Sequence, residues 1–415
     1  MSTHDQLRRR LGLGDSVVLG LGSMVGAGIF AALAPAAAAA GSWLLLALGI
    51  AAVLAYCNAM SSARLAARYP VSGGTYVYGR ERLGPFWGYL AGWGFVVGKT
   101  ASCAAMALTV GSYAWPDQAR AVAVAAVVAI TALDYLGVRK SALATRIIVA
   151  AVLAVLTVVV GVGLFGPHAT APALPERVGP GGVLEAAGLL FFAFAGYARI
   201  ATLGEEVRAP ARTIPRAIMI ALGVALAVYV LVAVAALNTL GSAGLAQGAD
   251  PLARVVSVAG APELTPVVRV GAVLAATGSL LALLLGVSRI VLAMARDRWL
   301  PGALAAVHPR FGGPHRAELV VGAVVAVAAA TFDLRAAIGF SSFTVLVYYL
   351  IANVAAGTLG AGEGRPARWV TILGTAGCVL VGCSLPRESA GAGLSVLALG
   401  AGWYFLRRER AGTTE

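Results

Sequence analysis

Long runs of apolar residues follow one another along almost the whole chain, separated by short polar connections. A run of about 20 residues is the length that an α-helix needs to cross the hydrocarbon core of a bilayer. The pattern therefore predicts an all-α polytopic membrane protein with about twelve transmembrane helices. The predicted spans cover residues 15–37, 42–66, 85–113, 119–137, 144–166, 183–204, 216–239, 265–295, 317–332, 335–357, 368–385 and 389–406.

The first predicted span is interrupted by small residues. Residues 20–30 read GLGSMVGAGIF, which places four glycines at a depth where lipid demands a continuous helix. Glycine weakens a helix and lets the backbone unwind, and irregular backbone at that depth is tolerated only against protein or a cavity. Interrupted helices are typical of the binding sites of secondary transporters. The alternative is a glycine-rich face for close helix packing.

Composition excludes a soluble protein with one membrane segment, because 60% of the 415 residues are hydrophobic and only 12% are charged. The net charge of +13 is compatible with nucleic-acid binding, but the placement of the basic residues argues against it. With the N-terminus inside, the cytoplasmic segments hold 23 of the 31 Lys and Arg residues, as the positive-inside rule requires. We therefore expect cytoplasmic N- and C-termini and contact with anionic lipids at the cytoplasmic face, with no nucleic-acid partner.

No motif indicates an enzyme, a metal site or a cofactor. The chain has no zinc-protease, phosphate-loop or nucleophile-elbow signature, and its cysteines lack the spacing of metal ligands. The N-terminal apolar run is too long and too rich in glycine for a cleaved signal peptide. The sequence says nothing about an accessory subunit. The cysteines are Cys57, Cys103, Cys378 and Cys383, all within predicted spans.

Four segments together carry a resemblance to a known family. They are GLGDSVVLGLGSMVGAGIF (12–30), RYPVSGGTYVYGRERLG (68–84), FFAFAGYARIATLGEEVRAPARTIPRAI (191–218) and SRIVLAMARDRWLP (288–301). With these segments the chain resembles the permeases of the amino acid–polyamine–organocation superfamily, and most of all bacterial relatives of the cationic amino acid transporters.

The resemblance implies a LeuT-like fold in a single membrane transport domain. Spans 1–5 (15–166) and spans 6–10 (183–357) would form inverted repeats, followed by two C-terminal helices (368–406). Residues 1–14 and 407–415 would be cytoplasmic. The sequence offers an independent sign of this symmetry, because the small-residue stretch AFAGYA interrupts span 6, five spans after the interruption of span 1.

By this resemblance the substrate binds to main-chain groups at the two interruptions. The amides of Gly26, Ala27 and Gly28 would hold a carboxylate, since the positive end of a half-helix dipole points at it. Carbonyl groups near Met24 and in span 6 would bind the ammonium group. Phe192 is a candidate gate, and core packing is the alternative for both flanking phenylalanines. The predicted substrate-binding residues are Ser23, Met24, Val25, Gly26, Ala27, Gly28, Phe192, Ala193, Phe194 and Ala195.

The predicted function is secondary active transport of amino acids across the plasma membrane of a bacterium, by proton symport or exchange. Ala198 stands where the resembled family has an acidic residue, and the predicted lining is small and apolar. Both features favour neutral, small or apolar substrates. The alternatives are an exchanger or exporter of amines or cationic amino acids with the same fold, and a channel or a non-transporting scaffold.

Candidate coupling residues are few. Lys99 lies near the middle of span 3, where a cation is costly and marks either a function or a buried structural contact. The resembled family places a lysine in span 5, where this chain has Val152, so that either Lys99 carries the proton or the protein is not proton-coupled. Thr277 and Ser279 are candidates for a sodium site, but hydroxyls within spans usually bond their own helix. We expect protons rather than sodium.

Arg199 is a gating candidate on span 6. Its potential ion-pair partners are Glu205, Glu206 and Asp15. The alternative is that its side chain reaches toward the inner membrane surface.

Overall fold

The computed structural model describes residues 11–70, 73–137, 142–167, 179–201 and 207–412. These residues are almost entirely helical, and the only strand pairing among them is an isolated bridge between Leu11 and Val207. Ten helical segments in the described part are long and apolar enough to cross a membrane. The prediction of an all-α polytopic membrane protein is confirmed.

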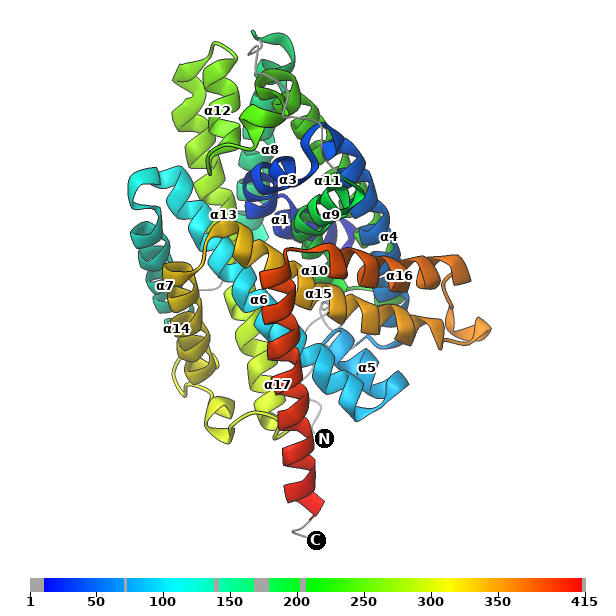
Figure 1. Ribbon diagram of the computed structural model, residues 1–415. Helices are drawn as coiled ribbons and strands as arrows, with labels where there is room; N and C mark the ends of the chain where they lie inside the picture. Colours follow the sequence, from blue (N-terminus) through cyan, green and yellow to red (C-terminus); the bar gives the residue numbers. More distant parts are fainter. Residues whose placement is uncertain (1–10, 71–72, 138–141, 168–178, 202–206, 413–415) are drawn as a thin grey trace.

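The helices follow one another with short connections (Figure 1). Those before residue 168 are α1 (Leu13–Met24), α2 (Ala27–Ala31), α3 (Leu33–Ala40), α4 (Leu44–Arg68), α5 (Thr75–Leu83), α6 (Pro85–Ala114), α7 (Ala119–Tyr135) and α8 (Ala142–Phe165), with 3₁₀ turns η1 (Gly41–Trp43) and η2 (Pro116–Gln118). Those after it are α9 (Pro180–Phe194), α10 (Ala198–Ala201), α11 (Pro210–Leu245), α12 (Pro251–Val258), α13 (Thr265–Arg296), α14 (His315–Thr331), α15 (Leu334–Gly357), α16 (Arg368–Ser384) and α17 (Arg387–Gly412), with 3₁₀ turns η3 (Ala195–Tyr197), η4 (Pro262–Leu264), η5 (Gly302–Ala305) and η6 (Ala361–Glu363).

Within the described residues, each of the twelve predicted spans coincides with helical structure. Predicted spans 4, 9 and 11 correspond to α7, α14 and α16, which have 17 residues each. Span 1 is divided among α1, α2 and α3, and span 6 among α9, η3 and α10. The two interruptions predicted from the sequence are therefore the places where these helices change conformation.

Helix α6 is the central element of the bundle. It packs against α5, α7, α13, α14, α15 and α17, and most of its residues are buried. Small residues make this possible: a Cβ atom on Gly98 would lie 2.2 Å from Thr344 Oγ1 of α15. Lys99, the next residue, thus lies on the most buried of the ten candidate membrane spans in the described part of the chain.

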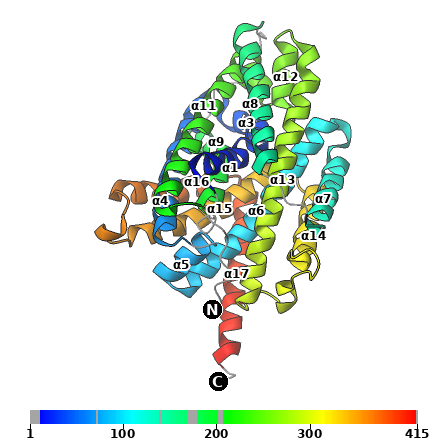
Figure 2. The same cartoon turned by 180° about the vertical axis from the view of Figure 1, so that it is seen from behind.

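The outer helices expose apolar side chains, as a protein surrounded by lipid requires. Leu143 and Ile147 of α8 and Leu399 of α17 are 65%, 60% and 72% exposed. Helices α7 and α14 lie side by side along one edge in both views (Figures 1 and 2). Helix α12 lies at one end of the bundle, and α5 lies toward the opposite end (Figure 1).

Candidate functional site

The interruption of span 1 is a complete loss of helical backbone over two residues. Helix α1 ends at Met24, Val25 has ψ 52°, and Gly26 has φ −114° and ψ −139° before α2 begins at Ala27. The first amide groups of a helix have no intrahelical acceptor, and the N-cap residue of α2, Gly26, has no side chain that could accept from them. These amides are the groups predicted to bind a carboxylate.

The interruption of span 6 is milder. Helix α9 ends at Phe194, and the chain continues as the 3₁₀ turn Ala195–Tyr197 directly into α10. Ala195 keeps near-helical angles, φ −63° and ψ −2°. A 3₁₀ turn tightens the helix and shifts its hydrogen bonds without opening the backbone. The two interruptions therefore expose different amounts of main chain.

Glycines hold the two interruptions against each other. A Cβ atom on Gly28 would lie 2.6 Å from the Cα atom of Ala193 in α9. In the other direction, a Cβ atom on Gly196 would lie 2.3 Å from the carbonyl oxygen of Ser23 and 2.8 Å from the amide nitrogen of Met24. Each interrupted helix thus approaches the backbone of the other at a position where only glycine fits.

Tyr229 of α11 joins the same two segments, and sequence reasoning missed it. Its hydroxyl lies 2.6 Å from the Met24 carbonyl oxygen and 2.9 Å from the Ala193 carbonyl oxygen. A hydroxyl has one proton, so it donates to one of these carbonyls at a time. A tyrosine in an otherwise apolar span was the signal available, because a buried hydroxyl needs a partner.

A cavity of about 170 Å³ adjoins both interruptions. Six of the predicted residues line this cavity: Ser23, Lys99, Phe192, Ala195, Arg199 and Ser279. The other predicted residues do not line it: Met24, Val25, Gly26, Ala27, Gly28, Ala193, Phe194 and Thr277. In this conformation Gly26, Ala27 and Gly28 at the start of α2 are buried and lie outside this lining.

The two phenylalanines of span 6 have different environments. Phe192 lines the cavity. Phe194 is fully buried, and its ring meets the Tyr229 ring edge-on with centroids 5.0 Å apart. The gating hypothesis remains a prediction for Phe192, whereas the contacts of Phe194 are those of core packing.

The cavity is lined by three basic side chains and, among the described residues, by no acidic one. Lys99 of α6 is 6% exposed, Arg199 belongs to α10, and Arg289 belongs to α13. Sequence reasoning did not single out Arg289, although it lies in the segment SRIVLAMARDRWLP that carried the family resemblance. A cation that enters this cavity therefore meets basic side chains and no carboxylate of the described lining.

Of the predicted ion-pair partners of Arg199, Asp15 lies among the described residues. Asp15 forms its ion pair with Arg146 of α8. Glu205 and Glu206 lie outside the described residues. In span 5, where the resembled family has a lysine, Val152 is buried among apolar residues.

The two ends of the cavity differ. Toward the α12 end, the buried rings of Phe30 and Tyr113 meet edge-on at 5.7 Å, and the Tyr113 hydroxyl donates to the Phe30 carbonyl at 3.2 Å. Toward the α5 end, the lining includes Gly73, Tyr76 and Arg289. The cavity therefore extends from the interruptions toward the α5 end, and aromatic packing closes the other end.

Helix α5 is anchored by polar contacts. The Tyr76 hydroxyl donates to Asp297, just after α13, and the Arg80 guanidinium lies 3.7 Å from the same carboxylate. At its start, the Thr75 amide donates to the Tyr348 hydroxyl at 3.0 Å. Because Tyr76 and Tyr348 both line the cavity, the position of α5 determines the shape of the cavity mouth.

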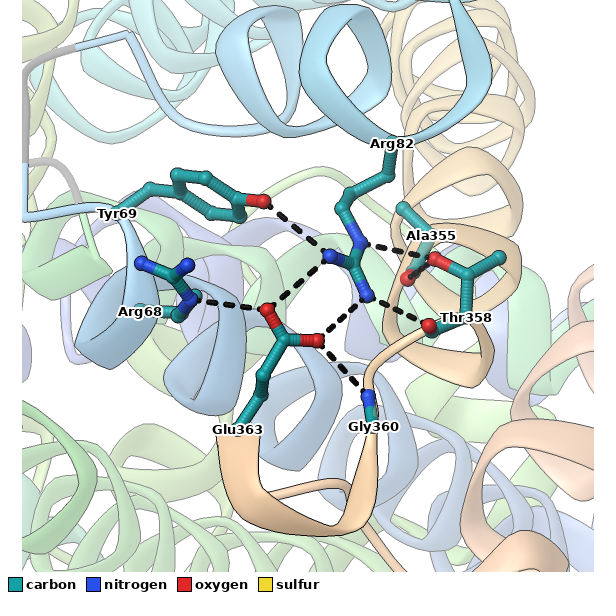
Figure 3. Close-up of polar contacts among 7 residues, drawn as sticks. All are labelled: Arg68, Tyr69, Arg82, Ala355, Thr358, Gly360 and Glu363. Atoms are coloured by element: carbon teal, nitrogen blue, oxygen red, sulfur yellow. Dashed lines mark hydrogen bonds and ion pairs between the residues drawn. The ribbon is translucent and has the colours of Figure 1, made fainter.

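A second anchor of α5 is centred on Glu363 of η6 (Figure 3). Its carboxylate accepts from Arg82 of α5 at 2.9 Å, from Arg68 of α4 at 3.0 Å and from the Gly360 amide at 2.9 Å. Arg82 also donates to the Thr358 hydroxyl at 3.0 Å. These contacts, the Gly360 amide first, lower the pKa of Glu363 to about 2, so that the anchor stays ionised at neutral pH.

Comparison with known proteins identifies the family to which the chain belongs. The profile of the amino acid permease family matches residues 11–388. The chain belongs to the amino acid permease family. It is 68% identical over 410 residues to an uncharacterised transporter of Mycobacterium tuberculosis, with 97% of this chain and 92% of that protein covered. The resemblance to amino acid–polyamine–organocation permeases is confirmed, and the protein is a multi-pass membrane transporter.

More distant relatives have names that state a substrate class. The branched-chain amino acid permease of Bacillus subtilis is 29% identical over 382 residues, which cover 85% of this chain and 81% of that protein. Cationic amino acid transporter 4 of Homo sapiens is 30% identical over 387 residues, which cover 84% of this chain and 59% of that protein. These two names point to different side chains, so the substrate of this permease has to be argued from its own residues.

Proposed function

We propose that this permease is a secondary active transporter that moves neutral, small or apolar amino acids across the plasma membrane of a bacterium by alternating access. The observation that carries the proposal is the cavity of about 170 Å³ that reaches Ser23 at one interrupted helix and Phe192 and Ala195 at the other. Main-chain groups at such interruptions bind the carboxylate and ammonium groups that all amino acids share. Phe192 would act as the gate.

The charges around the cavity favour neutral over cationic substrates. Lys99, Arg199 and Arg289 line it, and like charges repel strongly where little water screens them. Ala198 also lines the cavity, at the position where an acidic residue would attract a cationic side chain. A zwitterion with an apolar side chain brings no net charge into this environment.

The form of the cavity supports an alternating-access cycle. If the N- and C-termini are cytoplasmic, as the basic residues predict, the α5 end is the cytoplasmic end, and the described conformation is open toward the inside. The same orientation brings most of the basic residues to anionic lipid headgroups. Closing the α5 end and opening the α12 end would complete the cycle.

We propose proton symport or exchange, with Lys99 as the coupling candidate. Its side chain is buried and lines the cavity, so a change in its protonation would change the charge that the substrate meets. Sodium coupling through Thr277 and Ser279 has less support: Thr277 does not line the cavity, and the Ser279 hydroxyl lies 3.4 Å from the Gly22 carbonyl oxygen.

Uptake by purified protein in proteoliposomes tests this function. Neutral amino acids should compete for uptake better than arginine, lysine or glutamate. Best competition by arginine, lysine or an amine would favour the alternative of a cationic exchanger or exporter. Ion current without saturable uptake would favour a channel, and neither activity would favour a scaffold.

The role of Lys99 is tested by two substitutions. Lys99→Ala should remove the dependence of uptake on an imposed pH gradient and leave counterflow exchange at least partly intact. Lys99→Arg should not restore coupling, because a guanidinium stays charged over the accessible pH range. If Lys99→Ala still accumulates substrate in response to a proton gradient, Lys99 is structural.

A further inference from the structure

A second pocket lies between α7 and α14, apart from the two interruptions. It measures about 40 Å³, and Asp134 of α7 and Glu318 of α14 both line it. Asp134 is 4% exposed and Glu318 is 1% exposed. None of their carboxylate oxygens has a hydrogen-bond partner among the described residues. Two such carboxylates cannot both stay ionised without a nearby cation, because burial and mutual repulsion both penalise the second charge.

The fold holds the two acids together. Asp134 is the penultimate residue of α7, and Glu318 lies in the first turn of α14. The helices touch closely, since a Cβ atom on Gly322 of α14 would lie 2.4 Å from Thr131 Oγ1 of α7. A pocket of this size has room for a water molecule, through which a proton can enter or leave.

Arg289 lies between this acidic pocket and the cavity of about 170 Å³ that adjoins both interruptions, which is called the transport cavity below. It lines both of them, and its side chain is exposed. It does not bind either carboxylate in this conformation, because their oxygens have no hydrogen-bond partner. A long, flexible, permanently charged side chain in this place can neutralise the acidic pair or extend toward the cavity.

Other ionisable groups lie on the elements that pack around the pair. Helix α6, which packs against α7 and α14, contributes Lys99 and Cys103, both of them buried. The α13–α14 connection contributes His308, whose ring centroid is 5.2 Å from that of His315 at the start of α14. Tyr135 of α7 packs on both histidine rings. Arg289 and Lys99 are the cationic side chains of this set, and Arg289 is the one that lines the pocket.

We propose that Asp134 and Glu318 form a proton-binding site that controls Arg289. When the pair is ionised, it attracts the guanidinium away from the transport cavity. When a proton from water binds a carboxylate, the attraction weakens and Arg289 extends to the cavity, where it adds positive charge beside Lys99 and Arg199. The proposal rests on the proposed transport function, because the cavity is the site whose charge changes, and it predicts that pH at the α5 end regulates substrate affinity.

Infrared titration tests the proton site without any transport. Wild-type protein should show the C=O stretching band of a neutral carboxylic acid that disappears as pH rises, and Asp134→Asn and Glu318→Gln should each remove or shift it. Arg289→Gln should keep the band and shift its disappearance to higher pH, because a cation that favours the ionised pair is lost. Asp117→Asn, an exposed acid just before α7, is the matched control and should leave the band unchanged.

Counterflow in proteoliposomes tests the control of the cavity. Coupling to one proton changes substrate affinity by at most about tenfold per pH unit. The wild type and the control Asp117→Asn should show such a pH dependence of substrate affinity. Most of this dependence should be lost in Asp134→Asn, Glu318→Gln and Arg289→Gln. Arg289→Lys should retain part of it. Folded Asp134→Asn and Glu318→Gln variants with the wild-type band and pH dependence would overturn the proposal.

Two further outcomes separate the possible failures. If the wild type transports no amino acid, the proposed function fails, and the infrared titration still decides whether the pair binds a proton. If no such band appears at any pH, while sodium or calcium raises the melting temperature of the wild type and not of Asp134→Asn, the pocket holds a metal cation and the proton site is wrong.

Discussion

The interrupted helices of spans 1 and 6 occupy corresponding places in the chain, yet they break differently. Span 1 loses its helical backbone at Val25 and Gly26, whereas span 6 only tightens into the 3₁₀ turn Ala195–Tyr197. A full break releases amide groups that lipid cannot satisfy. A 3₁₀ turn releases few groups and keeps the helix continuous. Span 1 therefore offers polar main chain, and span 6 offers a surface that covers it.

The reciprocal glycine contacts make the two interruptions a single unit. Gly28 of span 1 packs on Ala193, and Gly196 of span 6 packs on the Ser23 carbonyl. The Tyr229 hydroxyl bonds both segments from α11. Backbone contacts in both directions therefore fix the position of the two interruptions relative to each other.

The largest loss of stability and of substrate binding should come from Gly196→Ala. The added Cβ atom would lie 2.3 Å from the Ser23 carbonyl oxygen and 2.4 Å from its carbon, and backbone atoms of span 1 cannot move aside without opening the contact. Overpacking of this kind costs about 1–3 kcal/mol, and we expect loss of substrate binding in a thermal-shift assay. The control is Gly223→Ala in α11, where nothing lies within 4 Å; it should be neutral or slightly stabilising. Equal substrate binding by Gly196→Ala and Gly223→Ala would contradict the close contact between the two interruptions.

A second pair of substitutions separates side-chain contacts from backbone contacts. Gly26→Ala places its Cβ atom 2.0 Å from Ser279 Oγ and 3.1 Å from Ser279 Cβ, so adding Ser279→Ala should restore most of the stability and binding. Gly28→Ala meets the Ala193 Cα atom at 2.6 Å, so adding Ala193→Gly should restore little. Melting temperatures and substrate affinities of the four single and two double variants, compared with the wild type in two double-mutant cycles, measure this. Full rescue of Gly28→Ala would mean that the helices separate easily.

Tyr229→Phe should have a smaller effect that acts on both interruptions at once. It removes the hydroxyl that lies 2.6 Å from the Met24 carbonyl oxygen and 2.9 Å from that of Ala193, and keeps the ring. We expect a loss of about 1 kcal/mol of stability and weaker substrate binding. Tyr56→Phe is the control, because the Tyr56 ring stacks on Trp369 away from both interruptions. Tighter binding in Tyr229→Phe would instead mean that the hydroxyl competes with the substrate for these carbonyls.

Sequence reasoning located the fold and the interruptions because both depend on local patterns. Apolar runs of fixed length gave the spans, and glycines at membrane depth marked the positions at which α1 ends and η3 begins. It missed Tyr229, Arg289, Asp134 and Glu318, whose roles depend on which helices lie side by side. The partners of Tyr229, for example, are 205 and 36 residues away along the chain, and no local pattern specifies such a contact.

The smallest effect on stability and substrate affinity should come from Glu363→Gln. This substitution weakens the contacts that hold α5 and leaves the contacts between the two interruptions intact. The folded-state pKa of Glu363 is about 2, below the value of about 4.3 for an unfolded chain. A lowered pKa means that the anchor stabilises the fold fully above the unfolded value and loses this contribution as pH falls toward 2. The melting temperature of the wild type should therefore exceed that of Glu363→Gln by a constant small margin from neutral pH down to about 5, and the margin should vanish in stronger acid. Substrate affinity at neutral pH should change less than in any variant of the interruptions, since the Glu363 carboxylate binds Arg68 of α4, Arg82 of α5 and the Gly360 amide, none of which belongs to an interruption (Figure 3). A margin that changes near neutral pH, or an affinity loss as large as that of Gly28→Ala, would show that α5 and the interruptions act as one unit.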